Sequence, residues 1–516
     1  MLTMTSALDR AERQYADRIA VVDLERNFSW AEHIQRIRRA SGLFAGLGIE
    51  AGQRFGIICE NSYRYMELLH AGYWCGVIPV PINHRLAPPE IRHILDDADC
   101  KYLFLGKDYL GVPASDDVAP WKERPVYVGP RLDQCDYPQY EELIDKAADV
   151  GPVNSGDDDL ALLLYTGGTT GKSKGVRLSH KNLTSNGLQV HMAMGVRTDD
   201  RYLHAAPMFH AADLLGTAYT LCGGAHAFLP VFSGEDSLRL LQEYEITVTM
   251  LAPTMIIVML QEPEFDSFNL SKFRLLFYGS SPMAAEWVQR SIERFEGTEI
   301  QQGYGLTETS PILTTLDPID HTDAVRSGNT DILRAAGRPV AGVDLRIMDD
   351  DGNEVPKGEP GEVVVRGPNV TEGYLNRPDE NETAFRDGWF FTGDFGRVDE
   401  KGLLFLLDRK KDMVITGGEN VYTSEVEAVL YQHADVHEAA VIGIPDEKYG
   451  EALFAVVVPA PGKILKSKDI IEHCRGKIGG YKIPRLMDFI EEMPKSAMGK
   501  ILKTDLRDIY SNREQD

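Results

Sequence analysis

Hydrophobic residues in the first part of the chain alternate between two spacings. Apolar side chains recur at helical spacing over residues 31–47, 63–74 and 91–98. Short apolar runs, typical of buried strands, separate these segments at residues 54–59, 77–82 and 102–105. Strands that alternate with helices indicate an α/β layer architecture. The same rhythm returns further along the chain, where we predict strands over residues 247–251, 275–280 and 300–305.

The pattern changes after residue 335. In residues 343–348 and 362–366, apolar side chains recur at every second position. The turn signal Asp349-Asp350-Asp351-Gly352 separates the two segments, so the pattern favours a small β unit. About a hundred residues of mixed pattern follow Arg409, enough for a separate domain. We therefore predict an α/β protein with a large N-terminal part and a smaller α+β C-terminal domain. The predicted boundaries are 1–408, divided into α/β subdomains 1–175 and 176–335 and a β-barrel-like subdomain 336–408, and then 409–516.

Composition excludes several classes of protein. The formal net charge of −25 argues against a nucleic-acid-binding surface. The six cysteines are scattered without a C-x-x-C pair, so no zinc or redox motif is indicated. No apolar run is long enough to span a bilayer, and the N-terminus lacks the pattern of a signal peptide. We expect a cytoplasmic protein without a membrane span or a nucleic-acid partner.

One glycine-rich loop carries the first chemical signal. An apolar strand ends at Tyr165 and opens into Thr166-Gly-Gly-Thr-Thr-Gly-Lys-Ser-Lys174. Glycine lets the backbone fold around an anion, and lysine adds positive charge, so the loop favours phosphate binding. A Walker A loop would need glycine where Thr166 stands, and an isolated loop of this kind can also be a plain surface turn. The predicted phosphate-binding residues are Thr166, Gly167, Gly168, Thr169, Thr170 and Lys174.

Four further motifs follow this loop in a fixed order. Each has a plain structural explanation when taken alone, such as a strand end, a turn or a solvated charge run. Together they resemble the adenylate-forming superfamily, in particular its 4-coumarate-CoA ligase-like and bacterial long-chain acyl-CoA synthetase members. Ser173, where proline is common in that superfamily, is a departure that we expect to be tolerated. The motifs are G-Y-G-L-T-E-T (303–309), W-F-F-T-G-D (389–394), D-R-K-K-D (408–412) with Gly417 and Gly418, and P-K-S-A-M-G-K (494–500).

The resemblance implies a set of nucleotide contacts. Tyr304 would stack on adenine, Thr307 would contact the α-phosphate, and Glu308 would help to hold Mg²⁺. Asp394 would grip the ribose hydroxyls, and Arg409 would reach the ribose. Lys500 would be the catalytic lysine that orients the carboxylate and the α-phosphate, acting with Thr307 and Glu308. The nucleotide site would be completed by Gly279, Ser280, Gln302 and Gly303.

The same resemblance implies a reaction in two steps. A carboxylic acid and ATP would form an acyl-adenylate, and coenzyme A would then displace AMP. The C-terminal domain would be a mobile lid that turns about Lys411, with Gly417 and Gly418 near the coenzyme A passage. An acyl carrier protein in place of coenzyme A, a non-catalytic acyl-nucleotide binder and a luciferase-type oxygenase stay open as alternatives, as does a homodimer.

One residue bears on the class of acid. Amino-acid-activating relatives carry an aspartate where this chain has His210, and a neutral histidine does not anchor an ammonium group. A histidine packed in the core is the competing explanation. We expect an apolar acid, whether fatty, aryl or polycyclic, in a pocket bordered by His210, Tyr278, Gly279 and Gly303.

Overall fold

The protein is described from a computed structural model, which covers residues 2–23, 26–122, 124–166, 173–416, 419–446, 449–495 and 501–510. The chain divides into two compact units. Unit 1 comprises Met1–Asp344 and Val365–Phe390, and unit 2 comprises Leu345–Val364 and Phe391–Asp516. Among the described residues, none of the helices has the length and apolar character needed to cross a membrane.

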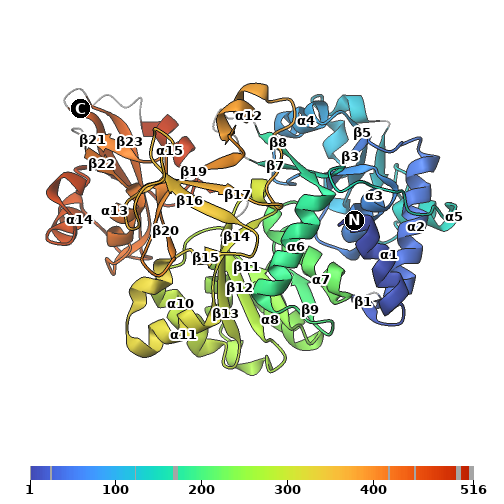
Figure 1. Ribbon diagram of the computed structural model, residues 1–516, viewed down its shortest axis with the longest axis horizontal. Helices are drawn as coiled ribbons and strands as arrows, with labels where there is room; N and C mark the ends of the chain where they lie inside the picture. Colours follow the sequence, from blue (N-terminus) through green and yellow to red (C-terminus); the bar gives the residue numbers. More distant parts are fainter. Residues whose placement is uncertain are drawn as a thin grey trace. The chain divides into compact units, whose positions relative to one another are not determined.

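The first sheet of unit 1 confirms the alternation read from the sequence. Its four strands have the order β4-β3-β5-β6 and are all parallel. Parallel neighbours need crossover connections, which the helices between the strands supply (Figure 1). The elements are α2 (Trp30–Gly46), β3 (Arg54–Ile58), α3 (Tyr63–Cys75), β4 (Ile78–Pro81), α4 (Pro88–Asp97), β5 (Cys100–Leu105), β6 (Pro125–Tyr127) and α5 (Tyr140–Lys146).

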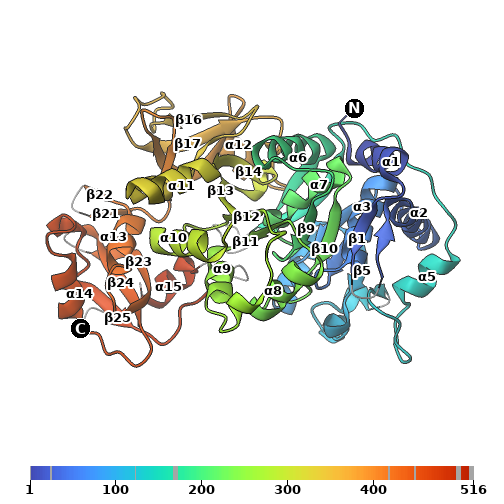
Figure 2. The ribbon, with the colours of Figure 1, turned by 90° about the horizontal axis from the view of Figure 1, so that it is seen from below.

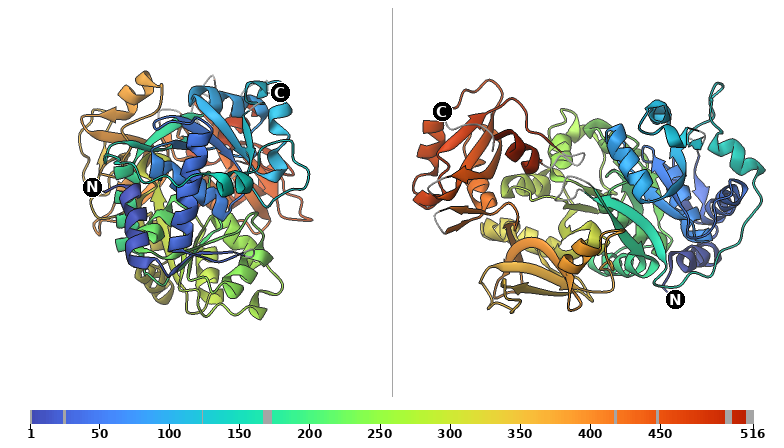
Figure 3. Two further views of the ribbon diagram at one scale, coloured as in Figure 1. Left: turned by 90° about the vertical axis from the view of Figure 1, so that its right-hand side faces the viewer. Right: turned by 90° about the horizontal axis from the view of Figure 1, so that it is seen from above.

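The second sheet of unit 1 has nine strands in the order β15-β14-β13-β12-β11-β9-β10-β1-β2. Its central strands β9 to β12 are parallel, and Figure 3 shows them in green beside the first sheet, in blue. Val21 of the N-terminal β1 pairs with His226 of β10, a contact that no local sequence pattern indicates. The strands are β1 (Ile19–Val22), β2 (Phe28–Ser29), β9 (Arg201–His204), β10 (Ala225–Phe228), β11 (Val248–Leu251), β12 (Leu275–Gly279), β13 (Glu299–Gly305), β14 (Ile312–Leu316) and β15 (Arg338–Pro339).

Helices and one hairpin complete unit 1. The hairpin of β7 (Leu160–Thr166) and β8 (Lys174–Ser179) forms a separate two-stranded sheet that carries the predicted phosphate loop. The short strand β18 (Phe385–Arg386) follows α12 (Pro378–Ala384). The remaining helices are α1 (Met4–Tyr15), α6 (His180–Met194), α7 (Gly216–Cys222), α8 (Gly234–Glu243), α9 (Pro253–Leu260), α10 (Ala285–Arg294) and α11 (Pro318–Ser327).

Most of the strands of unit 2 belong to two further sheets. The first is a five-stranded sheet with the order β16-β17-β19-β18, in which β20 pairs with β19. Its strands besides β18 are β16 (Asp344–Met348), β17 (Gly361–Arg366), β19 (Trp389–Val398) and β20 (Leu404–Arg409). The second has the order β22-β21-β24-β23, with β25 paired to β24. Its elements are β21 (Val414–Thr416), β22 (Glu419–Val421), α13 (Thr423–Leu430), β23 (Val436–Asp446), β24 (Gly450–Pro459), α14 (Ser467–Cys474), β25 (Leu486–Phe489) and α15 (Lys503–Tyr510).

The second sheet of unit 2 is covered on both faces. Val441 and Val457 pack in one apolar cluster with residues of α13 and α14, whereas Ile442 and Val456 pack in another with Leu506 of α15. Alternate residues of a strand point to opposite faces, which explains the division. Figure 2 shows α14 and α15 on opposite sides of β24. The prediction of an α/β protein with a smaller α+β C-terminal part is confirmed.

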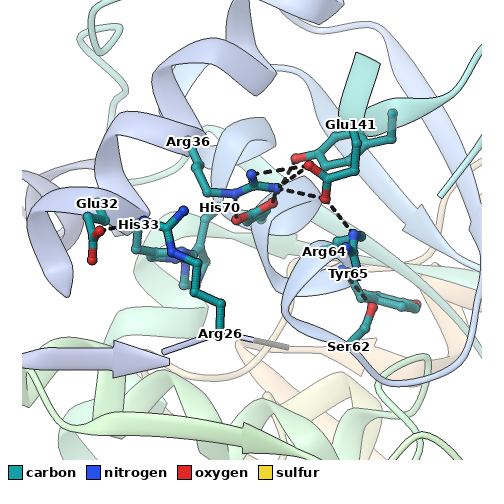
Figure 4. Close-up of polar contacts among 11 residues, drawn as sticks. Arg26, Glu32, His33, Arg36, Ser62, Arg64, Tyr65, His70 and Glu141 are labelled. Atoms are coloured by element: carbon teal, nitrogen blue, oxygen red, sulfur yellow. Dashed lines mark hydrogen bonds and ion pairs between the residues drawn. The ribbon is translucent and has the colours of Figure 1, made fainter. Parts of the chain in front are cut away.

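A balanced group of buried charges joins three helices of unit 1. Arg36 of α2 donates to Glu67 of α3 at 2.5 Å and to Glu141 of α5 at 3.0 Å. Arg64 donates to the same Glu141 at 2.5 Å, so both guanidinium groups converge on it (Figure 4). Tyr140 donates to the second oxygen of Glu67 at 3.0 Å. Since Glu67 is fully buried, these donors replace the water that its charge has lost.

A second buried polar group of unit 1 contains histidines. His204 contacts Asp213 at 2.8 Å and His226 at 2.9 Å, and His33 contacts His70 at 3.0 Å. His70, His204, His226 and Asp213 line a cavity of about 40 Å³. Burial lowers the pKa of His70 to about 3, helped by the charge of His204, and also places the pKa values of His33 and His226 well below their usual range. These three imidazoles are therefore neutral in the folded protein at neutral pH.

The histidine cluster predicts acid sensitivity. In the unfolded chain His70 takes a proton near its ordinary pKa of 6.5, whereas in the folded protein it does so only near 3. The unfolded state then binds more protons, so stability falls as the pH drops from 6.5 toward 3. For one such histidine the loss at pH 5 is about 2 kcal/mol.

Denaturant unfolding at pH 7.5 and pH 5 measures this dependence. His70→Asn should reduce the stability lost on acidification, and His437→Asn, at an exposed position, should leave it unchanged. Equal losses in wild type and His70→Asn would contradict the assignment.

Candidate active site

The predicted phosphate loop is closed by the β7–β8 hairpin. Thr166 stands opposite Lys174 in the strand register, and Tyr165 stands opposite Gly175. The two ends of the loop are therefore held together by strand pairing. Only Thr166, Ser173 and Lys174 of the loop lie among the described residues. The predicted contacts Gly167, Gly168, Thr169 and Thr170 lie outside them.

Lys174 and Glu308, predicted from separate motifs, both contact Tyr374. The Lys174 Nζ lies 5.3 Å from the centroid of the Tyr374 ring and 3.7 Å from Glu380 Oε1. The Tyr374 hydroxyl donates to Glu308 Oε1 at 2.8 Å. The structure thus brings the base of the phosphate loop and the predicted metal ligand to one tyrosine. No sequence pattern singled out Tyr374.

Main-chain hydrogen bonds fix the segment that carries Tyr374. Leu375 N donates to Gly175 O at 2.8 Å, and Arg177 N donates to Gly373 O at 3.1 Å, so residues 373–375 lie along β8. Thr371 N donates to Glu308 O at 2.8 Å. Gly373 has φ +140°, a value that L side chains rarely adopt, and this glycine beside an aromatic residue is the one signal that sequence reasoning could have used.

The second motif forms a strand end followed by the short 3₁₀ turn η6 (Thr307–Thr309). Thr309 accepts from Leu306 N at 3.0 Å and donates to Pro311 O at 2.7 Å, which closes the turn. A Cβ on Gly305 would lie 1.7 Å from Pro311 O, so only glycine fits there. Tyr304 and Thr307 are half-buried, and Glu308 is 8% exposed. Their predicted nucleotide contacts stay predictions.

Glu308 suits a hard cation chemically. A carboxylate is a preferred ligand of Mg²⁺, which commonly binds through one or two carboxylates together with substrate phosphates. Tyr374 occupies Oε1, and among the described residues no group donates to Oε2. Glu308 can therefore offer one oriented oxygen.

The two glycines predicted to line the acyl pocket are neighbours. Strands β12 and β13 pair Gly279 with Gly303 and Tyr278 with Gln302. A Cβ on Gly279 would lie 2.5 Å from Gly303 O, and one on Gly303 would lie 2.2 Å from Phe277 Cζ. These glycines are thus required by packing inside unit 1. Their role in a pocket stays a prediction.

The other predicted pocket residues differ in their surroundings. Tyr278 is 1% exposed, and its hydroxyl lies 3.0 Å from His321 Nε2, so it belongs to the core behind the strand ends. Ser280, predicted to complete the nucleotide site, follows β12 and has φ +71°. His210 is half-buried and precedes the 3₁₀ turn η4 (Ala211–Leu215), where its Nδ1 accepts from Ala212 N at 3.3 Å. It therefore caps a turn at the edge of the core.

Unit 2 brings the two predicted ribose residues together. Strands β19 and β20 pair Asp394 with Arg409, and their side chains contact at 2.6 Å. Gly393 has φ +72°, and Asp394 N donates to Thr392 Oγ1 at 3.1 Å, which shapes the turn before the carboxylate. A carboxylate that pairs with a guanidinium group can still accept from hydroxyl groups through its remaining lone pairs.

The predicted hinge lies directly after this strand pair. Lys411 is exposed in the turn that follows β20. Beside it, Asp408 accepts from Thr423 N at 2.5 Å, which ties the turn to the first residue of α13. Gly417, Gly418 and Lys500 lie outside the described residues. Lys495 and Ile501, the described residues on either side of residues 496–500, form an antiparallel β-bridge.

Comparison with known proteins identifies the family. The profile described as "AMP-binding enzyme" matches residues 8–375, and the one described as "AMP-binding enzyme C-terminal domain" matches residues 425–500. A feruloyl-CoA synthase of Amycolatopsis sp is 36% identical over 93% of both chains. The long-chain-fatty-acid–CoA ligase FadD13 of Mycobacterium tuberculosis is 35% identical over 92% of this chain and 91% of that one. The ATP-bound crystal structure of MatB from Rhodopseudomonas palustris is 30% identical, covers 99% of both chains and has a TM-score of 0.88.

The chain belongs to the AMP-binding enzyme family. It is an enzyme, an AMP-forming acid–thiol ligase that uses ATP. The resemblance drawn from the ordered motifs is thereby confirmed. The individual roles of the site residues stay predictions.

The contact between Gly303 and Phe277 gives a direct test of this packing. Gly303→Ala should cost about 1–3 kcal/mol of stability, because its methyl group would overlap the Phe277 ring. Phe277→Leu removes the overlapping ring atoms, so the double variant should be more stable than the sum of the two single effects.

Chemical denaturation of the four proteins measures this coupling. Gly46→Ala is the control, since nothing lies within 4 Å of that position. Strict additivity would show that Phe277 does not restrict residue 303.

Proposed function

We propose that this enzyme is an ATP-dependent ligase that joins an apolar carboxylic acid to coenzyme A through an acyl-adenylate. The observation that carries the proposal is the contact of both Lys174 and Glu308 with Tyr374. One of these side chains carries the positive charge that a phosphate needs, and the other offers the oxygen that a phosphate-bound Mg²⁺ needs.

The chemistry requires two negatively charged groups to meet. The carboxylate of the acid attacks the α-phosphorus of ATP, a new C–O–P bond forms, and pyrophosphate leaves with the bonding electrons. Catalysis of this step is chiefly positioning and charge neutralisation. Bound Mg²⁺ would supply positive charge beside the phosphates. Lys174 and Lys500 would supply the cations of the chain, and Thr307 would donate to the α-phosphate.

The second step releases AMP. The sulfur of coenzyme A attacks the carbonyl carbon of the acyl-adenylate, and the bond between that carbon and the phosphate oxygen breaks. Asp394 and Arg409, paired at 2.6 Å, would hold the ribose during both steps. Lys411 would be the point about which the C-terminal domain turns between them.

The acid is proposed to be apolar, in a pocket bordered by His210. The relatives named above include a feruloyl-CoA synthase and a long-chain-fatty-acid ligase, so aryl and fatty acids head the candidates. A panel of aryl, long-chain fatty and polycyclic acids, read by AMP formation with coenzyme A present, tests the proposal. Acid-dependent AMP formation without consumption of coenzyme A would point to an acyl carrier protein. No AMP formation with any acid would reject the proposal.

The phosphate role of Lys174 gives the next prediction. Lys174→Ala should raise the KM for ATP about tenfold, because one charge-assisted contact to the phosphates is lost. Lys181→Ala is the matched control, since Lys181 is an exposed lysine paired with Asp158 at 3.6 Å. An unchanged KM and kcat in Lys174→Ala would show that the loop is only a turn.

The two steps should respond to different residues. Lys500→Ala should abolish acyl-adenylate formation but leave thioester formation from supplied acyl-adenylate largely intact. Lys411→Pro should do the reverse, because proline fixes φ at the turning point. Lys411→Ala keeps the backbone free and should preserve both steps.

Pyrophosphate release and thioester formation from synthetic acyl-adenylate measure the two steps separately. If Lys500→Ala and Lys411→Pro depress both steps equally, one arrangement of the enzyme performs both.

A further inference from the structure

We propose that Tyr374 is a positioning residue that orients Glu308 for the metal ion with its hydroxyl and holds Lys174 for the phosphates with its ring. This inference rests on the proposed function. Glu308 and Lys174 are 134 positions apart in the chain, and Tyr374 is a described residue that contacts both.

The hydroxyl of Tyr374 restricts the Glu308 carboxylate. It donates to Oε1 at 2.8 Å, and the main-chain oxygen of Glu308 accepts from Thr371 N at 2.8 Å. The same short segment thus holds both the backbone and the side chain of Glu308. With Oε1 engaged and the residue 8% exposed, Oε2 is presented in one direction. A ligand oriented before the metal binds loses less entropy on binding.

The ring of Tyr374 holds Lys174 without neutralising it. The ammonium lies 5.3 Å from the ring centroid, within the range of a cation–π interaction. Its carboxylate neighbour, Glu380, is 3.7 Å away and 31% exposed, so water weakens that ion pair. A close carboxylate would compete with a phosphate for the lysine, whereas an aromatic face leaves its N–H groups for the phosphate.

Tyr374 itself is fixed in place. Its N donates to Asn381 Oδ1 at 2.7 Å, and Asn381 Nδ2 donates back to its carbonyl oxygen at 2.9 Å. Tyr374 forms an antiparallel β-bridge with Val176 of β8, and the centroid of its ring lies 6.0 Å from that of Phe385. The side chain is therefore held in one position. Substitutions can test its hydroxyl and its ring separately.

Two variants distinguish the two ends. Tyr374→Phe keeps the ring and removes the hydroxyl, and Tyr374→Leu removes both. Binding of ATP is measured by calorimetry without an acid substrate, once with Mg²⁺ and once with a chelator. In Tyr374→Phe, the gain in ATP affinity from Mg²⁺ should be about tenfold smaller than in wild type. The ATP affinity measured with the chelator should be unchanged. Tyr374→Leu should also lower the ATP affinity measured with the chelator, because Lys174 loses its contact with the ring.

Tyr140→Phe is the matched control. The Tyr140 hydroxyl also donates to a buried glutamate of unit 1, Glu67 Oε2, at 3.0 Å, but it lies on α5. This variant should lose stability and keep the Mg²⁺ dependence of ATP binding. The inference is overturned if Tyr374→Phe keeps the full Mg²⁺ effect, or if Tyr140→Phe loses as much of it. Failure of wild type to bind ATP would instead reject the proposed function.

Discussion

The alignment of residues 371–375 with β8 is the constraint on which the site in unit 1 depends. Main-chain hydrogen bonds from Leu375 to Gly175 and from Arg177 to Gly373 hold a loop against the strand that closes the phosphate loop. This pairing places Tyr374 where it contacts both Glu308 and Lys174. The site is therefore supported by backbone contacts, which do not depend on the identity of the side chains around them.

The chain is strongly acidic, yet its substrate ATP is a polyanion. Most of its surface charge is unfavourable for ATP, since the formal net charge is −25. Arg409 is already paired with Asp394, and Lys410 with Asp350 and Glu362. Lys174 pairs with Glu380 at 3.7 Å, a longer contact than any of these, and its other neighbour, the ring of Tyr374, carries no charge. Local arrangement, rather than overall charge, thus determines where a phosphate can bind.

Sequence periodicity predicted the elements but not the contacts between them. The strands at residues 54–59 and 300–305 agree with β3 (Arg54–Ile58) and β13 (Glu299–Gly305), because their apolar patterns are local. The pairing of Val21 with His226 and the cluster of four histidines join residues far apart in the chain, so no window of sequence contains them. The order of the motifs indicated Asp394 and Arg409 as candidate ribose-binding residues. The register of β19 and β20 places them opposite each other. No sequence pattern indicated Tyr374, because its contacts with Glu308 and Lys174 exist only in the folded chain.

The buried carboxylates of unit 1 differ in the number of hydrogen-bond donors that they receive. Arg36 and Arg64 balance Glu67 and Glu141, and each carboxylate has at least two donors. Glu308, by contrast, receives one donor on Oε1, and among the described residues none on Oε2. A buried carboxylate that is only partly satisfied costs stability unless another positive partner completes it. This difference sets Glu308 apart from Glu67 and Glu141, and it supports the proposal that Glu308 holds a metal ion.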